Sequence, residues 1–243
     1  MKSLSLTTWS LFEDDVDFVT LRQMISQASA LTAFTYTAGR GRRWGSLSMT
    51  ASSSREDVSP HSLVNKLRFQ KSTLRKLHLN FVHEAYTFTA ESPSVFVSSA
   101  QLHEFAHLEN LTLDVSSYCR HIFDREDIGP GWDESTCLTE LLPSTICDLT
   151  IFIHDIEQEE YWLDLIHLGK HVVSGRHLGL RRLQINAMLV VRDAISASQD
   201  QEYEETREER TRKILAAKEP DVRRAFRSSR VQVVFKLPAD FGQ

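Results

Sequence analysis

One spacing of apolar residues recurs along this 243-residue chain and constrains its fold more than any other feature. The clearest copy is Leu108, Leu111 and Leu113, with apolar residues at offsets 0, 3 and 5. In an extended strand, offsets 3 and 5 point to the same side because side chains alternate with a period of two. The other copies are Met1, Leu4 and Leu6; Leu31, Phe34 and Tyr36; Leu74, Leu77 and Leu79; Ile146, Leu149 and Ile151; and Leu180, Leu183 and Ile185. Each copy predicts a short strand with one buried face, and stacked neighbours can bury such faces for one another, as in a solenoid.

The intervals between the copies have room for one helix each. Apolar residues with helical spacing occupy four of them. These residues are Phe18, Leu21, Ile25 and Ala28; Leu63, Val64 and Leu67, after Pro60; Leu102, Phe105 and Ala106; and Trp162, Leu165, Ile166, Gly169 and Val173. A repeated order of helix and strand predicts parallel strands on one side and helices on the other. We therefore predict a single α/β domain over residues 1–243, a short irregular solenoid of the leucine-rich-repeat kind.

Some segments depart from the repeat. Residues 40–59 are rich in Gly, Ser and Arg and predict a mobile loop, and residues 116–134 predict a second long connection. Residues 199–218 are highly charged and predict an exposed helix with i,i+4 ion pairs, Glu208 with Arg212 and Glu209 with Lys213.

The C-terminal part, residues 220–237, predicts a closing helix and strand. The apolar stripe of the preceding charged helix is thin, consisting of Tyr203, Ile214 and Ala217. Pro220 is expected to begin a separate helical turn with an apolar side formed by Val222, Ala225 and Phe226. Val231, Val233 and Phe235 alternate and predict a final strand.

Charge and cysteine content narrow the class of protein. A net charge of −5 and a pI of about 6.1 argue against a nucleic-acid-binding surface as the main purpose. The sequence holds no apolar run long enough to cross a membrane. Cys119, Cys137 and Cys147 are odd in number and have no framework spacing, so we expect reduced thiols in a cytoplasmic or nuclear protein.

Several repeat copies together resemble leucine-rich repeat proteins. The segments are LRKLHLN at 74–80, LENLTLDV at 108–115, LLPSTICDLTIF at 141–152 and LRRLQIN at 180–186. They are most similar to the irregular repeat region of fungal F-box proteins. That resemblance implies a substrate-recognition role in a ubiquitin ligase, with any F-box segment upstream of Met1.

Two features depart from the leucine-rich pattern. The intervals between copies exceed the usual 20–29 residues. The position that ordinarily holds a ladder of Asn or Cys holds other residues here, which places that ladder in doubt. These residues are Trp9, Gly39, Val82, Ser116, His154 and Met188.

His103, Glu104 and His107 match the HExxH motif and define an alternative function, a zinc-dependent hydrolase. On a helix, the two histidines would share a face and bind zinc while the glutamate served as general base. The motif ends one residue before Leu108, however, and no second motif accompanies the possible third ligands. We therefore predict no catalytic residue, no metal and no cofactor, and expect the match to be coincidental.

Residues that alternate with the core positions are expected to face away from the helices and to bind a protein partner. The candidates are Lys76, His78, Asn110, Thr112, Asp114, Thr150, Phe152, Arg182 and Gln184. Phe152 and Arg182 stand out because interfaces rest on aromatic and arginine anchors. A merely solvated sheet face, or a degenerate remnant without a selected partner, are the alternatives. The unpaired edge strand at Met1 to Leu6 also predicts self-association.

Overall fold

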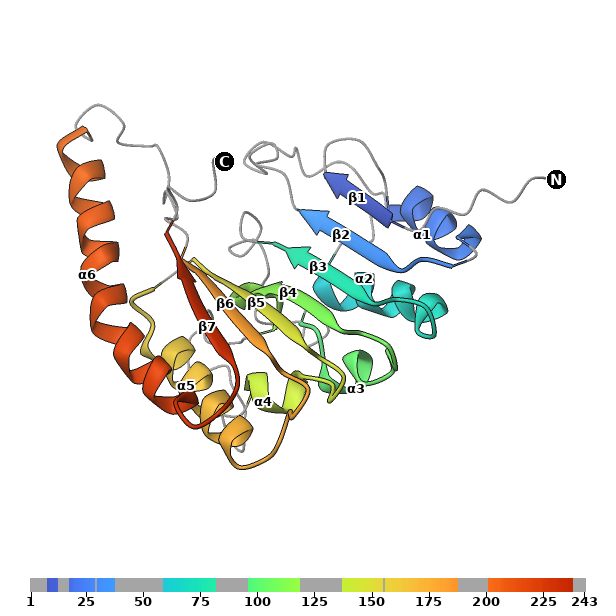
Figure 1. Cartoon of the computed structure of the whole chain (residues 1–243). Coiled ribbons are helices and arrows are strands. Elements are labelled where there is room, and N and C mark those ends of the chain that lie inside the picture. The colour runs from blue at the N-terminus through green and yellow to red at the C-terminus, as the bar shows by residue number, and fades with distance from the viewer. Residues whose placement is uncertain are drawn as a thin grey trace, which may run out of the picture.

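The computed structural model describes residues 8–12, 18–28, 30–37, 59–81, 96–118, 137–154, 156–187 and 201–237. Within them, seven strands form one sheet in chain order, and every neighbouring pair is parallel (Figure 1). The strands are β1 (Thr8–Phe12), β2 (Ala33–Thr37), β3 (Lys76–Asn80), β4 (Asn110–Asp114), β5 (Asp148–Ile153), β6 (Arg182–Ala187) and β7 (Gln232–Lys236). The chain is thus a mixed α/β protein built on an open parallel sheet.

The register of the sheet follows the repeated spacing. Leu111 on β4 lies opposite Leu77 on β3 and Leu149 on β5. All residues that the five copies from Leu31 to Ile185 place inward are buried, with exposed fractions of 4% or less. The predicted phase of these strands is therefore confirmed. The predicted closing strand is also present as β7, and Val233 is its buried residue.

The prediction places the first strand of the sheet at the wrong residues, Met1 to Leu6. The strand beside β2 is β1, in which Trp9 pairs with Phe34 and Leu11 with Tyr36. Leu6, Trp9 and Leu11 satisfy the same spacing as Met1, Leu4 and Leu6, so the pattern alone allowed two registers five residues apart. Pairing with β2 selects the later one. Residues 1–7 lie outside the described part of the chain.

Helices cover one face of the sheet. Figure 1 shows α2, α3, α4 and α5 along one side of the strands, with α6 beside β7. Ile25, Leu63, Leu102 and Trp162 are buried in the same core as the inward strand residues. The helical segments are α1 (Phe18–Gln27), α2 (Pro60–Leu67), η3 (Arg68–Gln70), α3 (Ser99–Leu102), η5 (Val115–Ser117), α4 (Cys137–Leu141), α5 (Glu159–Val173) and α6 (Gln201–Phe226). Burial of apolar area between helices and sheet, at about 25 cal/mol per Å², is the main stabilising contribution.

Two predicted core residues are exposed. Ala106 lies beyond α3, which ends at Leu102, so the helical spacing no longer applies to it. Val173 is the last residue of α5 and is 45% exposed, whereas its neighbour Val172 is 7% exposed. The buried face of α5 runs through Trp162, Leu165 and Gly169 to Val172. Spacings of three and four residues are both helical, and packing selects between them.

The structure describes only part of the two predicted loops, residues 40–59 and 116–134. Within residues 40–59 the structure describes Ser59 alone, which is the N-cap of α2. The sequence predicts that a long loop begins at residue 116, but residues 116–118 are buried and continue the 3-10 turn that follows β4. The rest of that connection lies outside the described residues.

The C-terminal helix α6 is one continuous element that contains Pro220. The prediction of a separate helix beginning at Pro220 is therefore wrong. A proline inside a helix removes one backbone hydrogen bond, but packing on both sides of Pro220 holds the helix together. Leu215 is buried before it, and Val222 and Phe226 after it. Ala217 is exposed, so Leu215 rather than Ala217 carries the apolar stripe.

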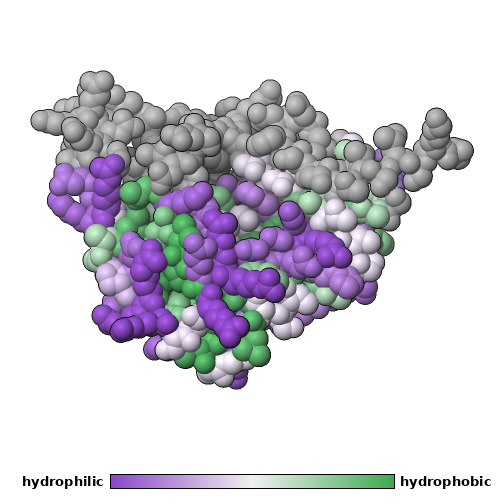
Figure 2. All heavy atoms as spheres, in the orientation of Figure 1, coloured by the Kyte–Doolittle hydropathy of each residue, from purple (hydrophilic) through white to green (hydrophobic). Residues whose placement is uncertain are grey.

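Helix α6 packs against α5 at Gly169. A Cβ atom at this position would lie 2.7 Å from the Ala225 Cβ and 2.9 Å from the Phe226 ring, so only glycine permits this approach. The carboxylate of Glu157 pairs with Arg210 at 2.6 Å, and that of Glu159 pairs with Lys218. Viewed as in Figure 1, hydrophilic residues lie along α6 and a hydrophobic band lies between α6 and β7 (Figure 2).

The last strand is partly covered at its edge by Arg223 of α6. The guanidinium donates a hydrogen bond to the Val233 carbonyl oxygen at 2.8 Å. It also lies 5.3 Å from the centre of the Phe235 ring. Bare edge strands invite pairing with other chains, so Arg223 occupies an acceptor that such pairing would use.

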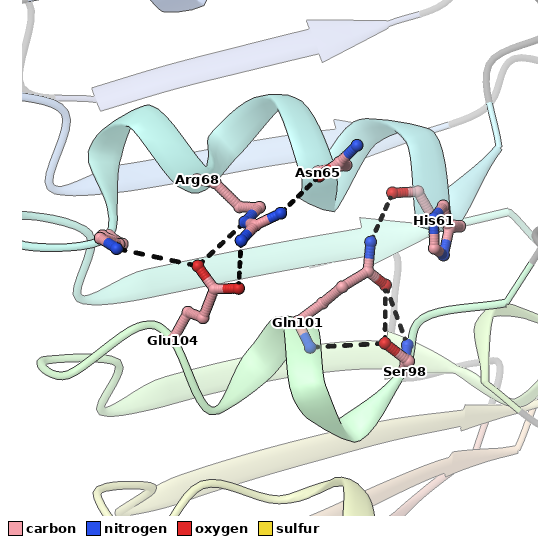
Figure 3. Close-up of polar contacts among 7 residues, drawn as sticks. His61, Asn65, Arg68, Ser98, Gln101 and Glu104 are labelled. Carbon is pink, nitrogen blue, oxygen red and sulfur yellow. Dashed lines mark hydrogen bonds and ion pairs between the residues drawn. The ribbon is translucent and has the colours of Figure 1, made fainter.

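Helices α2 and α3 begin with capping boxes and are joined by Gln101 (Figure 3). The Gln101 Oε1 accepts from the Ser98 N–H at 3.0 Å, and its Nε2 donates to the His61 carbonyl oxygen at 3.0 Å. The order Ser-x-x-Gln at 98–101 is the sequence signature of a capping box. It was a usable signal for the start of α3, which the apolar spacing alone did not provide.

Candidate partner-binding face

The face of the sheet opposite the core carries rows of side chains, which we call the polar face. Because the strands are parallel and in register, equivalent residues lie side by side. The first row is Lys76, Asn110, Asp148, Arg182 and Gln232; the second is His78, Thr112, Thr150, Gln184 and Val234; the third includes Asp114, Phe152, Asn186 and Lys236.

The predicted partner-binding residues lie on these rows but differ in exposure. Lys76 and Arg182 are exposed in the first row. The half-buried residues are His78, Asn110, Thr112, Thr150, Phe152 and Gln184. Asp114 is fully buried, with an exposed fraction of 0%, so its side chain is not on the surface of this chain, and its contact with a partner stays a prediction. Exposure therefore decreases from the first row towards the carboxyl ends of the strands.

Asp114 is buried because its carboxylate binds the chain itself. The Oδ2 atom accepts hydrogen bonds from the Phe81 N–H at 2.7 Å and from the Ser117 hydroxyl at 2.6 Å. These bonds tie the end of β3 to the turn after β4. An acidic side chain that bonds a residue three positions later is a common local motif, and Asp114 with Ser117 carries that signal in the sequence.

An aromatic contact crosses the middle of the polar face. The rings of His78 on β3 and Phe152 on β5 have centroids 5.9 Å apart and are tilted by 40°. Strand β4 lies between these two strands, so the rings meet above it. Since β4 contributes the small Thr112 at the level of His78, the contact has room to form. The sequence pattern identified both residues but did not predict that they meet.

Burial lowers the pKa of His78, and the nearby Asp114 carboxylate partly opposes this shift. The imidazole is therefore mainly neutral near pH 7. Its Nε2 atom is buried and has no hydrogen-bond partner among the described residues. A buried polar atom without a partner costs about 1–3 kcal/mol.

Polar side chains are also buried at the carboxyl ends of β4 and β5. The Ser116 hydroxyl lies 3.4 Å from the ring nitrogens of His154, and both residues are buried. The ring of His154 in turn lies 6.4 Å from that of Tyr161. Ser116 and His154 occupy the positions where a ladder of Asn or Cys was missing. A contact between polar side chains therefore exists at this level, formed by different residue types.

A line of hydrogen bonds orders the polar face along β6. The Arg182 guanidinium donates to the Gln184 Oε1 at 3.0 Å, and the Gln184 Nε2 donates to the Asn186 Oδ1 at 2.9 Å. The predicted anchor Arg182 is thus held in place at an exposed position. Preorganised side chains lose less entropy when they bind.

The HExxH motif does not lie on a helix. Helix α3 ends at Leu102, His103 is its C-cap, and the following residues form turns. The Arg68 guanidinium binds the Glu104 carboxylate through two contacts, at 2.5 and 2.9 Å. The arrangement that this motif needs, two histidines on one helical face and a glutamate aimed at water, is not formed. The described residues contain no group of His, Cys, Asp and Glu arranged for a metal ion.

Asp164 is a second buried carboxyl, on the helix side of the sheet. Burial raises its pKa to about 8, and the hydrogen bond that its Oδ1 accepts from the Leu138 N–H opposes the shift. That bond, at 2.9 Å, caps the first turn of α4. The group is therefore mainly protonated at neutral pH. Its burial could not be predicted from the sequence, because an acidic residue within a helix is normally solvated.

Cys147 is a free thiol and is half-buried. This agrees with the predicted reduced state for that residue, while the side chains of Cys119 and Cys137 lie outside the described part.

None of the described helices combines the length and the apolar character that a membrane span requires.

Comparison with known proteins identified no relative. No protein-family model matches the chain, and the searches of curated proteins and of solved structures found no match.

Proposed function

We propose that this protein is an interaction module that binds a protein partner on the polar face of its sheet. The observation that carries the proposal is the His78–Phe152 contact, a half-buried aromatic pair that meets above β4. Aromatic side chains flanked by polar groups are typical of interface anchors. The exposed Arg182, held by Gln184, lies on the same face.

We further propose that the fold is an irregular leucine-rich-repeat solenoid. Seven parallel strands in chain order, with one apolar face in constant phase, support this proposal. Such solenoids bind partners on the face formed by their strands. A substrate-receptor role in a ubiquitin ligase is the more specific proposal, supported by the repeat-like segments; association with ligase subunits would have to be demonstrated directly.

A comparison of partner recovery tests the binding proposal. Proteins that copurify with the chain from intracellular extract should be lost with Phe152→Ser or Arg182→Glu. They should be retained with Leu178→Ser, which changes a side chain that is 82% exposed on the loop after α5. Circular dichroism of each variant checks that the fold is intact.

Two results would contradict the proposal. One is equal recovery of the same proteins with the wild type and both polar-face variants. The other is their loss with Leu178→Ser alone. Ubiquitin-ligase subunits among the retained proteins would support the more specific role.

A further inference from the structure

A groove on the helix side of the molecule has features of a second binding site. It lies between η3, which follows α2, and the turn after α3, and has a volume of about 610 Å³. Its wall includes Lys66, Arg68, Phe69, Lys71 and Glu104. Since α2 and α3 cover the sheet face opposite the polar face, this groove is separate from the surface proposed above.

Phe69 is held in an exposed position by its neighbours. Its side chain is 71% exposed, whereas Leu67, two residues before it, and Gln70, directly after it, are buried. The Gln70 side chain accepts from the Leu31 N–H at 3.1 Å and donates to the Ala28 carbonyl oxygen at 2.8 Å. The short 3-10 turn is thereby anchored to the core, so Phe69 cannot turn inward without breaking these bonds. The exposed aromatic ring is thus preorganised.

Positive charge surrounds this ring. Arg68 and Lys71 contribute two positive charges to the groove, and Glu104 contributes one negative charge. The Glu104 carboxylate is bound by the Arg68 guanidinium, as Figure 3 shows, and lies 3.9 Å from the Lys71 amine. The groove therefore carries an excess of positive charge in a chain whose net charge is −5.

We infer that this groove binds an acidic segment of a partner protein that places an apolar side chain against Phe69. The charge excess complements acidic side chains, and the exposed ring provides the apolar anchor. A membrane surface fits less well, because stable membrane binding needs a broad apolar face. Among the described residues that line the groove, Phe69 is the single large apolar side chain.

The test uses a fluorescently labelled peptide of glutamates with one central leucine, and fluorescence anisotropy measures its affinity for the whole chain. Binding should weaken about tenfold with Phe69→Ala and by a similar factor with Lys71→Glu. It should also weaken as salt increases, because exposed charges are screened.

Leu178→Ala is the matched control for Phe69→Ala, since it removes another exposed apolar side chain. Arg230→Glu makes the same charge change as Lys71→Glu at an exposed position outside the groove. Both controls should bind as the wild type does.

Three outcomes would overturn the inference. The first is no measurable binding of the acidic peptide. The second is equal binding of a peptide with glutamines in place of the glutamates. The third is equal weakening by the groove variants and their controls. Vesicles containing phosphatidylserine form a further arm: sedimentation of the chain with them, lost in Phe69→Ala, together with failure of the peptide, would assign the groove to lipid instead. None of these results bears on binding at the polar face.

Discussion

The two faces of the sheet consist of alternate residues of the same strands, yet they differ in how uniformly they are built. On the helix side, Leu111 and its equivalents on the neighbouring strands are all buried. On the polar face, Thr112 is half-buried while Asp114, two residues further along, is fully buried. Alternation along a strand therefore determines which side of the sheet a residue faces. Its burial on the polar face depends on the residues that follow each strand, as Phe81 and Ser117 do for Asp114.

The largest expected effect comes from removing a core side chain. Leu111→Ala would leave a cavity in the layer between β4 and the helices, and such changes cost about 2–5 kcal/mol of unfolding free energy. Denaturant unfolding measures the loss. A loss below about 1 kcal/mol would show that Leu111 does not face the core.

Asp114→Ala should cost less, about 1–3 kcal/mol, because the Phe81 N–H and the Ser117 hydroxyl would lose their acceptor in a buried site. Asp148→Ala is a suitable control, since Asp148 lies on the same face in the first row and is half-buried. The same unfolding experiment compares them. Equal losses of unfolding free energy for the two variants would mean that Asp114, in the third row, contributes no more to stability than Asp148, in the first row.

Asp164 should make stability depend on pH. Its pKa of about 8 in the folded state lies above the ordinary value of 3.8, so folding favours the protonated form. Its contribution is complete below about pH 4 and is lost as pH rises through about 8, with a slope of at most about 1.4 kcal/mol per pH unit. Urea unfolding at several pH values should show a flatter profile for Asp164→Asn.

The exposed Asp221 provides the control for this titration. Asp221→Asn should leave the pH profile of stability as it is in the wild type. If Asp164→Asn kept the full slope between pH 4 and pH 8, another group would have to be responsible for it.

Thr112→Ala should have the smallest effect, within about 1 kcal/mol, because Thr112 is a half-buried strand residue on the polar face. It is adjacent to Leu111, so local propensity cannot account for a large difference between the two variants. The pairs Leu77 with His78 and Leu183 with Gln184 extend the comparison. A loss at Thr112 equal to that at Leu111 would contradict the register.

Self-association remains a prediction for the N-terminal edge of the sheet. Strand β1 lies at that edge, whereas β7 at the opposite edge has an acceptor occupied by Arg223. Light scattering over a range of concentrations measures association.

The sequence by itself determined the parallel α/β architecture and the phase of its inner strands, because a period of two and a helical period leave different apolar patterns. It also identified α2 and the buried start of α5 from local spacing. It left open the position of the first strand, because Met1–Leu4–Leu6 and Leu6–Trp9–Leu11 fit equally well. Only pairing with β2 distinguishes these two registers.

Tertiary structure decided what depends on contacts between distant residues. Glu104 of the apparent zinc motif forms an ion pair with Arg68, which links the end of α2 to the turn after α3. Helix α6 continues past Pro220 because it packs against α5. Asp114 is buried by a bond to Phe81, and Phe152 meets His78 above an intervening strand. Local periodicity describes only the direction in which a side chain points. Its partners are brought to it by other segments of the chain, and those contacts exist only once the sheet has formed.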